Sequence, residues 1–259
     1  VNYVGKGVTY DSEGTSRDIN MGVATGAERH AMNPLNSLDP DLLPGAFNEA
    51  ELDGPSGQRG AGYIWDAALR AGKSVRNYGF FLDLVRYYAP PQFGGIPPIR
   101  DPHQANIQVA FPAHPSLLSR TDPYFRGFDN KLPDFYRYQE WAREFDEFAK
   151  AGSLPELELV RLMNDHMGSF DSAIDGVNTP ETQQADNDYA VGLLVDKVAH
   201  SPFAKDTLIF VLEDDSQDGP DHVDAHRSVA FVVSPYARRR AVDSGLYTGC
   251  GMLRTIELI

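Results

Sequence analysis

Acidic side chains follow an apolar run in the last third of the chain. Glu213, Asp214 and Asp215 come directly after residues 207–212 (TLIFVL), whose continuous apolar character predicts a strand covered on both faces. Ligands of open α/β sheets bind at the carboxyl ends of the strands. Three adjacent carboxylates repel one another, and a divalent cation would relieve that repulsion. The pattern predicts a metal site, with a solvated acidic loop as the alternative.

Imidazole groups follow the acidic triplet within a few residues. The same segment continues with Asp221, His222, Asp224 and His226. Imidazole together with carboxylate suits zinc, manganese or iron, whereas carboxylate with water suits magnesium or calcium. The spacing matches no regular zinc motif, so the residues predict a divalent metal ion without selecting among Zn, Mn, Mg, Ca and Fe.

A second polar cluster follows another predicted strand, residues 156–163. Asn164, Asp165 and His166 come at its carboxyl end. If both strands belong to one parallel sheet, the two clusters share an edge and form one site. The alternative is that Asp165 and His166 form an Asx turn or a hydrogen-bonded loop.

The elements that would position these clusters are visible as periodic segments. Helices are predicted at 63–71, ended by Gly72, and at 134–150, ended by Gly152, the latter with an aromatic core face. Thr179 and Pro180 are typical of a helix start, and that helix should run to about residue 200. Its inward face is predicted to carry Ala185, Tyr189, Leu193 and Val198. Further strands are predicted at 74–81 and 228–233.

This alternation predicts an α/β fold in a single domain over residues 1–259. Residues 1–60 and 89–133 are loop-rich, and 134–259 form the core with the metal-site loops. His103 and His114 fall in the second loop-rich stretch and are interpreted as surface histidines, with a place at the rim of the pocket as the alternative.

Charge and hydropathy exclude some classes of function. The 259 residues carry a net charge of −14, which disfavours nucleic-acid binding by charge and requires local neutralisation for an anionic substrate. No apolar run is long enough for a transmembrane segment. The single cysteine, Cys250, rules out an internal disulfide.

Three stretches resemble one known family. The run TLIFVLEDDSQDGPDHVDAHRSVAFVVSPYARR resembles the C-terminal signature of the phosphoesterase family that includes bacterial phospholipases C and acid phosphatases, within the alkaline phosphatase superfamily. NDHMGS with TPETQQADNDYAVGLLVDKVAHSPFAKDTLIF resembles the segment before it, and GYIWDAALRAGKSVRNYG an earlier helix and strand. The resemblance is densest over residues 158–238.

The resemblance implies a three-layer α/β/α fold with a mostly parallel sheet, and metal-dependent hydrolysis of phosphate esters by a phosphatase or phospholipase C-like phosphodiesterase. Asp214 and Asp215 would bind the metal. His166, beside Asp165, would contact the phosphoryl group or assist the leaving group, and His222 and His226 would line the pocket. The implied substrate is a small phosphate ester or a lipid headgroup, and the implied location is periplasmic or secreted.

One part of the family pattern is missing. Residues 1–59 carry neither the acidic-plus-Asn metal motif nor the Ser or Thr nucleophile that precede the matching segments in the family. We expect that the chain lacks an N-terminal portion and that its nucleophile lies upstream of residue 1. Some relatives that share the sequence DHVDAHR also carry an upstream β-propeller. The alternatives are a non-catalytic metal-binding remnant on the same scaffold, and hydrolysis of sulfate or phosphonate esters.

Overall fold

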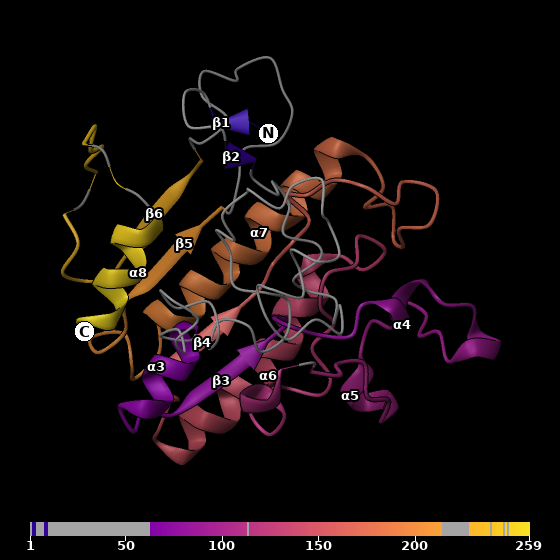
Figure 1. The fold of residues 1–259 in the computed structure, drawn as a ribbon, viewed down its shortest axis with the longest axis horizontal. Coiled ribbons are helices and arrows are strands. Elements are labelled where there is room, and N and C mark those ends of the chain that lie inside the picture. Colours follow the sequence, from indigo (N-terminus) through magenta and orange to yellow (C-terminus); the bar gives the residue numbers. More distant parts are fainter. Residues whose placement is uncertain are drawn as a thin grey trace. The chain divides into compact units, whose positions relative to one another are not determined.

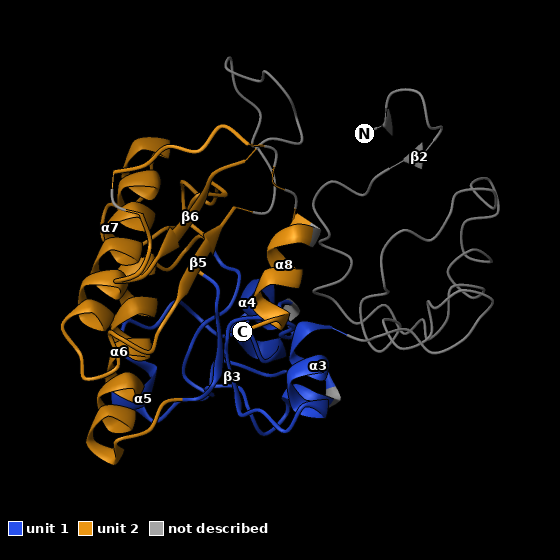
Figure 2. Ribbon diagram, turned by 90° about the vertical axis from the view of Figure 1, so that its left-hand side faces the viewer, with its two compact units in different colours: residues 1–129, 155–161 blue, residues 130–154, 162–259 orange. Residues whose placement is uncertain are grey.

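The computed structural model describes residues 2–3, 8–9, 63–112, 114–213, 228–238, 240–245, 247 and 249–259. The chain divides into two compact units (Figure 2): unit 1 comprises residues 1–129 and 155–161, and unit 2 residues 130–154 and 162–259. Helices occur together with both parallel and antiparallel strand pairs, so the mixed α/β class is confirmed. The three-layer arrangement stays a prediction.

Unit 1 contains a parallel pair of strands (Figure 1). Helix α3 (Ile64–Arg70) leads into β3 (Val75–Tyr78), and β3 pairs in parallel with β4 (Leu157–Val160). Gly72 takes a φ of +77° just after α3, as predicted for the residue that ends this helix. The strands predicted at 74–81 and 156–163 both exist, but each is shorter than predicted.

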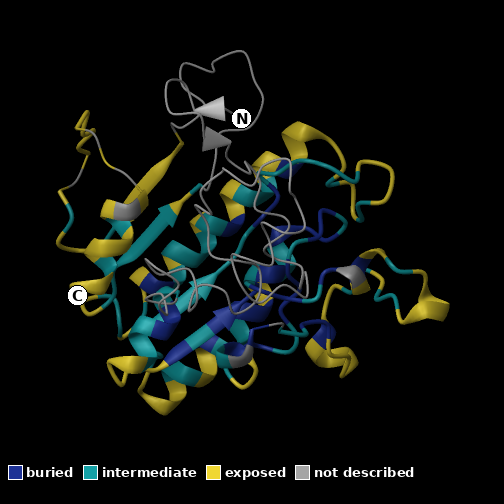
Figure 3. Ribbon diagram, in the orientation of Figure 1, coloured by how far each residue is buried: buried dark blue, intermediate teal, exposed yellow. Residues whose placement is uncertain are grey.

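Short elements fill the loop-rich part of unit 1, as the Pro and Gly content predicts. They are α4 (Val85–Tyr88), η4 (Pro91–Phe93), α5 (Pro102–Ala105) and η5 (Pro115–Leu117), and β1 (Asn2–Tyr3) pairs with β2 (Val8–Thr9) near the start of the chain. The core gathers around Trp65, Val75, Phe81 and Leu117, and Figure 3 shows β3 as mostly buried. Arg126, buried beside Asp129, donates to the carbonyl oxygens of Ile96 and Pro97 and so holds the Pro-rich loop.

Unit 2 is built on two long helices that pack together. They are α6 (Asp134–Ala151) and α7 (Pro180–Ala199). The predicted aromatic face of α6 is confirmed, since Trp141 and Phe145 are buried with ring centroids 4.9 Å apart. Thr179 caps α7 by accepting the Thr182 N–H, as the sequence predicts. Gly152 ends α6 with a φ of +73°.

The inward face of α7 differs from the prediction. Val198 is buried, but Ala185 is exposed and the Tyr189 side chain is 56% exposed, so the prediction for these two residues is wrong. The first half of α7 instead turns polar residues inward, among them the fully buried Gln183. An apolar periodicity cannot detect a buried face made of amides and carboxylates.

Strands β5 (Ile209–Leu212) and β6 (Ala230–Val233) form an antiparallel pair, and α8 (Gly249–Glu257) closes the chain. Residues 207–211 are only half-buried and Leu212 is 43% exposed, so the prediction that the 207–212 strand is covered on both faces is wrong for the described part of the chain. None of the helices in the described ranges has the length and apolar character needed to cross a bilayer.

Two glycines of unit 2 give a matched test of this backbone. Gly152→Ala should lower the free energy of unfolding by about 1–2 kcal/mol, because a left-handed φ strains any residue with a Cβ. Gly192 lies in the middle of α7 at an exposed position, with open space where a Cβ would be. Gly192→Ala should therefore raise the free energy of unfolding by about 1 kcal/mol. Urea denaturation measures both, and equal effects of the two variants would contradict the assigned backbone.

Candidate functional site

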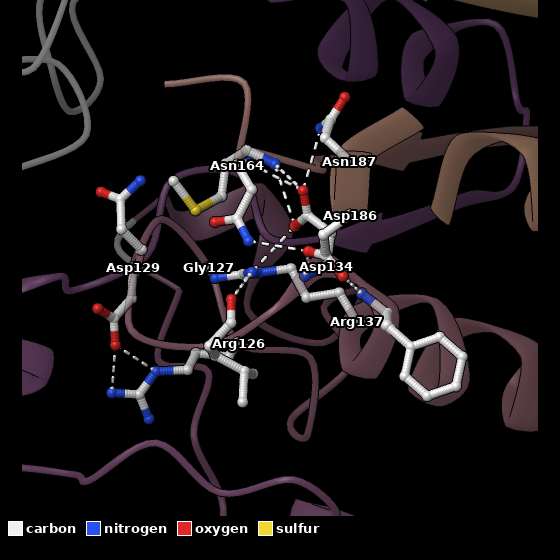
Figure 4. Close-up of polar contacts among 12 residues, drawn as sticks. Arg126, Gly127, Asp129, Asp134, Arg137, Asn164, Asp186 and Asn187 are labelled. Carbon is white, nitrogen blue, oxygen red and sulfur yellow. Dashed lines mark hydrogen bonds and ion pairs between the residues drawn. The ribbon is translucent and has the colours of Figure 1, made fainter. Parts of the chain in front are cut away.

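The loop that follows β4 is held at its start by a buried carboxylate. Asp134, fully buried at the start of α6, accepts the backbone N–H of Met163 (3.0 Å) and of Asn164 (2.8 Å) through Oδ2. Its Oδ1 accepts from Nη1 of Arg137 at 2.9 Å, and Asn187 donates to Oδ2 at 3.0 Å. Figure 4 shows these groups converging on one carboxylate. Removing one member of such a buried ion pair costs about 3–5 kcal/mol.

A second carboxylate connects the two helices to the same loop. Asp186 of α7 accepts the backbone N–H of Asp134 (2.5 Å) and of Phe135 (3.2 Å), so it caps the start of α6 from another helix. It also accepts from Nδ2 of Asn164 at 2.9 Å (Figure 4). Helix α6 begins after Pro133, whose side chain cannot accept a hydrogen bond. Asp186 therefore supplies the acceptor oxygens for the first N–H groups of α6.

Two amide side chains hold the other end of the loop. Gln183 accepts the N–H of Gly168 through Oε1 at 2.8 Å and donates to the carbonyl oxygen of the same residue through Nε2 at 2.7 Å. Asn130 donates to the carbonyl oxygen of His166. Residues 163–168, which we call the His166 loop, are therefore anchored at both ends by side chains from elsewhere in unit 2.

The pKa of Asp186 is shifted by its surroundings. Burial raises the pKa of Asp186 above its ordinary 3.8, and the negative charge of Asp134 raises it further. The hydrogen bonds from Asn164 and from the α6 backbone act in the opposite direction. The folded protein thus holds a proton on Asp186 more tightly than the unfolded chain does.

The predicted site residues fall into two groups. Asp165 and His166 lie half-buried on the His166 loop, whose backbone turns through bonds from His166 N to Met163 O and from Met167 N to Asp165 O, both 3.1 Å. Asp214, Asp215, His222 and His226 lie outside the described residues. Strand β4 pairs with β3, and β5 pairs with β6, so no described sheet contains both predicted strands.

The carboxylates beside the His166 loop accept hydrogen bonds from N–H groups. Within the described ranges, no three histidine, cysteine, aspartate or glutamate side chains gather as metal ligands. The carboxylates of Asp134 and Asp186 are occupied by N–H donors, which makes them structural anchors rather than ligands. Asp214 and Asp215, the metal ligands that the family resemblance implies, lie outside the described residues.

A histidine that the sequence placed at the surface is buried in unit 1. His114 is 2% exposed and lies edge-on to the rings of Tyr63, Trp65 and Phe81, so the surface interpretation is wrong. The Ser116 hydroxyl lies 2.7 Å from His114 Nδ1 and donates to Oδ1 of Asp66 at 2.7 Å.

This order of groups differs from that of a catalytic triad. A triad places the carboxylate on the imidazole, which then activates the hydroxyl. Here the Asp66 carboxylate accepts from the Ser116 hydroxyl instead of from the imidazole. Trp65 Nε1 donates to the hydroxyl oxygen of Ser116 at 3.2 Å. The cluster therefore joins α3 to η5 inside the core of unit 1.

A cavity of about 430 Å³ occurs in unit 2 beside β5, β6 and α8. The described residues that line it are mostly apolar and include no carboxylate or imidazole: Leu208, Phe210, Val232, Tyr247, Gly251, Met252 and Thr255. Such a lining is unsuited to phosphate chemistry. Of the site residues predicted from the sequence, the structure describes Asp165 and His166, both on the His166 loop.

Comparisons with protein-family models, with curated proteins and with solved structures find no match to this chain. The resemblance to the phosphoesterase family therefore rests on the motifs quoted from the sequence.

The raised pKa of Asp186 predicts a specific dependence of stability on pH. The contribution of Asp186 is greatest below its ordinary pKa of 3.8 and falls as pH rises through its raised pKa. In Asp186→Asn this dependence is absent. The free energy of unfolding of the variant minus that of the wild type should therefore rise as pH increases above about 4.

Urea denaturation at a series of pH values measures this difference. Asp188→Asn, at an exposed position of the same helix, controls for the loss of one negative charge. A difference that stays constant, or falls, as pH rises would contradict the assigned environment of Asp186.

Proposed function

We propose that this chain belongs to a metal-dependent phosphoester hydrolase with a three-layer α/β/α fold, acting as a phosphatase or a phospholipase C-like phosphodiesterase. Asp214 and Asp215 are assigned to the metal ion, and His166, beside Asp165, to the phosphoryl group or the leaving group. His222 and His226 are assigned to the pocket wall. The proposal assigns no nucleophile to the described residues.

The anchored His166 loop is the observation that carries this proposal. The loop follows β4 in the sequence, and residues that follow the strands of α/β sheets commonly bind ligands. Buried side chains from α6, α7 and residue 130 fix the backbone on both sides of His166. A binding group on a loop needs such support to keep a productive geometry.

The chemistry assigned to His166 follows from what phosphoryl transfer needs. The reaction depends mainly on positioning and on stabilising charge around the phosphoryl oxygens. A metal ion, when bound, neutralises charge on those oxygens. An imidazole N–H can donate to a phosphoryl oxygen or give its proton to the leaving alkoxide, and a half-buried, anchored loop presents it with little loss of freedom on binding.

Substitution of His166 tests this role. His166→Gln removes the titratable ring but keeps the backbone carbonyl that accepts from Asn130. It should lower kcat for a chromogenic phosphate ester by roughly 10²- to 10⁴-fold, the usual contribution of a general acid or base. His200→Gln, at an exposed position after α7, is the matched control and should leave kcat unchanged.

The assay uses the full-length polypeptide, and metal content is measured in parallel on Asp214→Asn. Loss of metal and of turnover in that variant supports the assignment when its metal-free form melts at the same temperature as the metal-free wild type. Metal binding without turnover in the wild type would favour the non-catalytic metal-binding alternative. A wild type with neither property would contradict the proposal, and hydrolysis of a sulfate or phosphonate ester alone would change the substrate class.

A further inference from the structure

We propose that Gln183 is the positioning residue for His166: its side-chain amide fixes the exit of the His166 loop and thereby the place of the imidazole. This inference rests on the proposed function, because it assigns His166 a task that depends on position. Gln183 lies in the first turns of α7, and none of its surface is exposed.

The side-chain amide of Gln183 is bonded at both of its ends. Gln183 makes two opposed bonds to one residue, accepting the N–H of Gly168 at 2.8 Å and donating to its carbonyl oxygen at 2.7 Å. The same Nε2 donates to the carbonyl oxygen of Val177 at 3.3 Å. Both ends of the amide are thus committed, and the peptide group on either side of Gly168 is fixed in orientation.

Gly168 permits this close arrangement. A Cβ at position 168 would lie 3.3 Å from Oδ1 of Asn130, closer than side chains normally approach. Asn130 is also the residue that donates to the carbonyl oxygen of His166. The absence of a side chain at residue 168 therefore lets Gln183 and Asn130 hold neighbouring parts of the loop at once.

The loop between its two anchors is short. Asp134 fixes the N–H groups of Met163 and Asn164, and Gln183 fixes Gly168. Only three residues separate Asn164 from Gly168, and His166 is the central one. A rotation of the Gly168 peptide would change the position of His166, because so short a segment cannot absorb it.

Only an amide can make this set of bonds. It combines an acceptor oxygen with a donor NH₂ group, whereas an ionised carboxylate only accepts. Gln183→Glu keeps the shape but directs an oxygen at the carbonyl oxygens of Gly168 and Val177. Gln183→Met keeps a similar length and removes every bond without introducing a charge.

The experiment compares these variants with Gln184→Glu, the same change at the adjacent, exposed position of α7. In folded Gln183→Glu and Gln183→Met, kcat for a chromogenic phosphate ester should fall roughly 10- to 100-fold, since small displacements of a catalytic group have effects of this size. KM should change little, because the ester is still bound. Gln184→Glu should leave both constants unchanged.

A spectroscopic measurement keeps the test independent of turnover. The ring Cε1–H signal of His166, assigned by its loss in His166→Gln, should shift and broaden in the Gln183 variants and stay in place in Gln184→Glu. If Gln183→Glu fails to fold, the His166 signal is measured in Gln183→Met alone. An unchanged His166 signal and an unchanged kcat in a folded Gln183 variant would overturn the positioning role.

The two proposals fail in different ways. A wild type without phosphoester hydrolysis but with a His166 signal that responds to Gln183 would contradict the proposed function and support the positioning. A wild type that hydrolyses the ester, with kcat independent of Gln183, would contradict the positioning alone.

Discussion

The carboxylate of Asp134 is the constraint on which the rest of unit 2 depends. It is fully buried, and it is stabilised by Arg137, by Asn187 and by two backbone N–H groups of the His166 loop. Burying a charge is unfavourable unless such partners are present. The partners come from α6, α7 and the loop, so the three segments are held together by the need to satisfy one charge.

The second carboxylate of the pair, Asp186, adds a different constraint. It caps α6 from α7, and burial raises its pKa, which the negative charge of the neighbouring Asp134 raises further. Two like charges in one buried network oppose folding, and the hydrogen bonds that they accept offset this repulsion. An apolar core would hold two helices together without any of these groups, so the network is better explained by the loop that it anchors than by helix packing alone.

Helices α3, α6 and α7 could be predicted from sequence because local rules govern them, whereas α4, α5 and α8 were not predicted. The aromatic stripe of α6, the Thr179 cap of α7 and the glycines after α3 and α6 depend on neighbouring residues only. The inward face of α7 could not be predicted in this way, since Gln183 and Asp186 are buried by partners distant in sequence. Buried polar residues leave no apolar period to detect.

The candidate site was predictable in part. The sequence singled out Asp165 and His166 from their place after a strand, and the structure puts both on an anchored loop. It gave no signal for Asn130, Gln183 or Asp186, because lone amides and carboxylates in a sequence resemble ordinary surface residues. A polar residue at an inward helix position, such as Gln183 one turn after the Thr179 cap, is the pattern that would have indicated them.

Native-state hydrogen exchange tests most directly whether buried side chains fix the His166 loop. The amides of Met163, Asn164 and Gly168 are bonded to Asp134 and Gln183, so they should exchange as slowly as the interior amides of α6. Exchange of these three amides at the rate of an exposed loop, while α6 stays protected, would contradict the account.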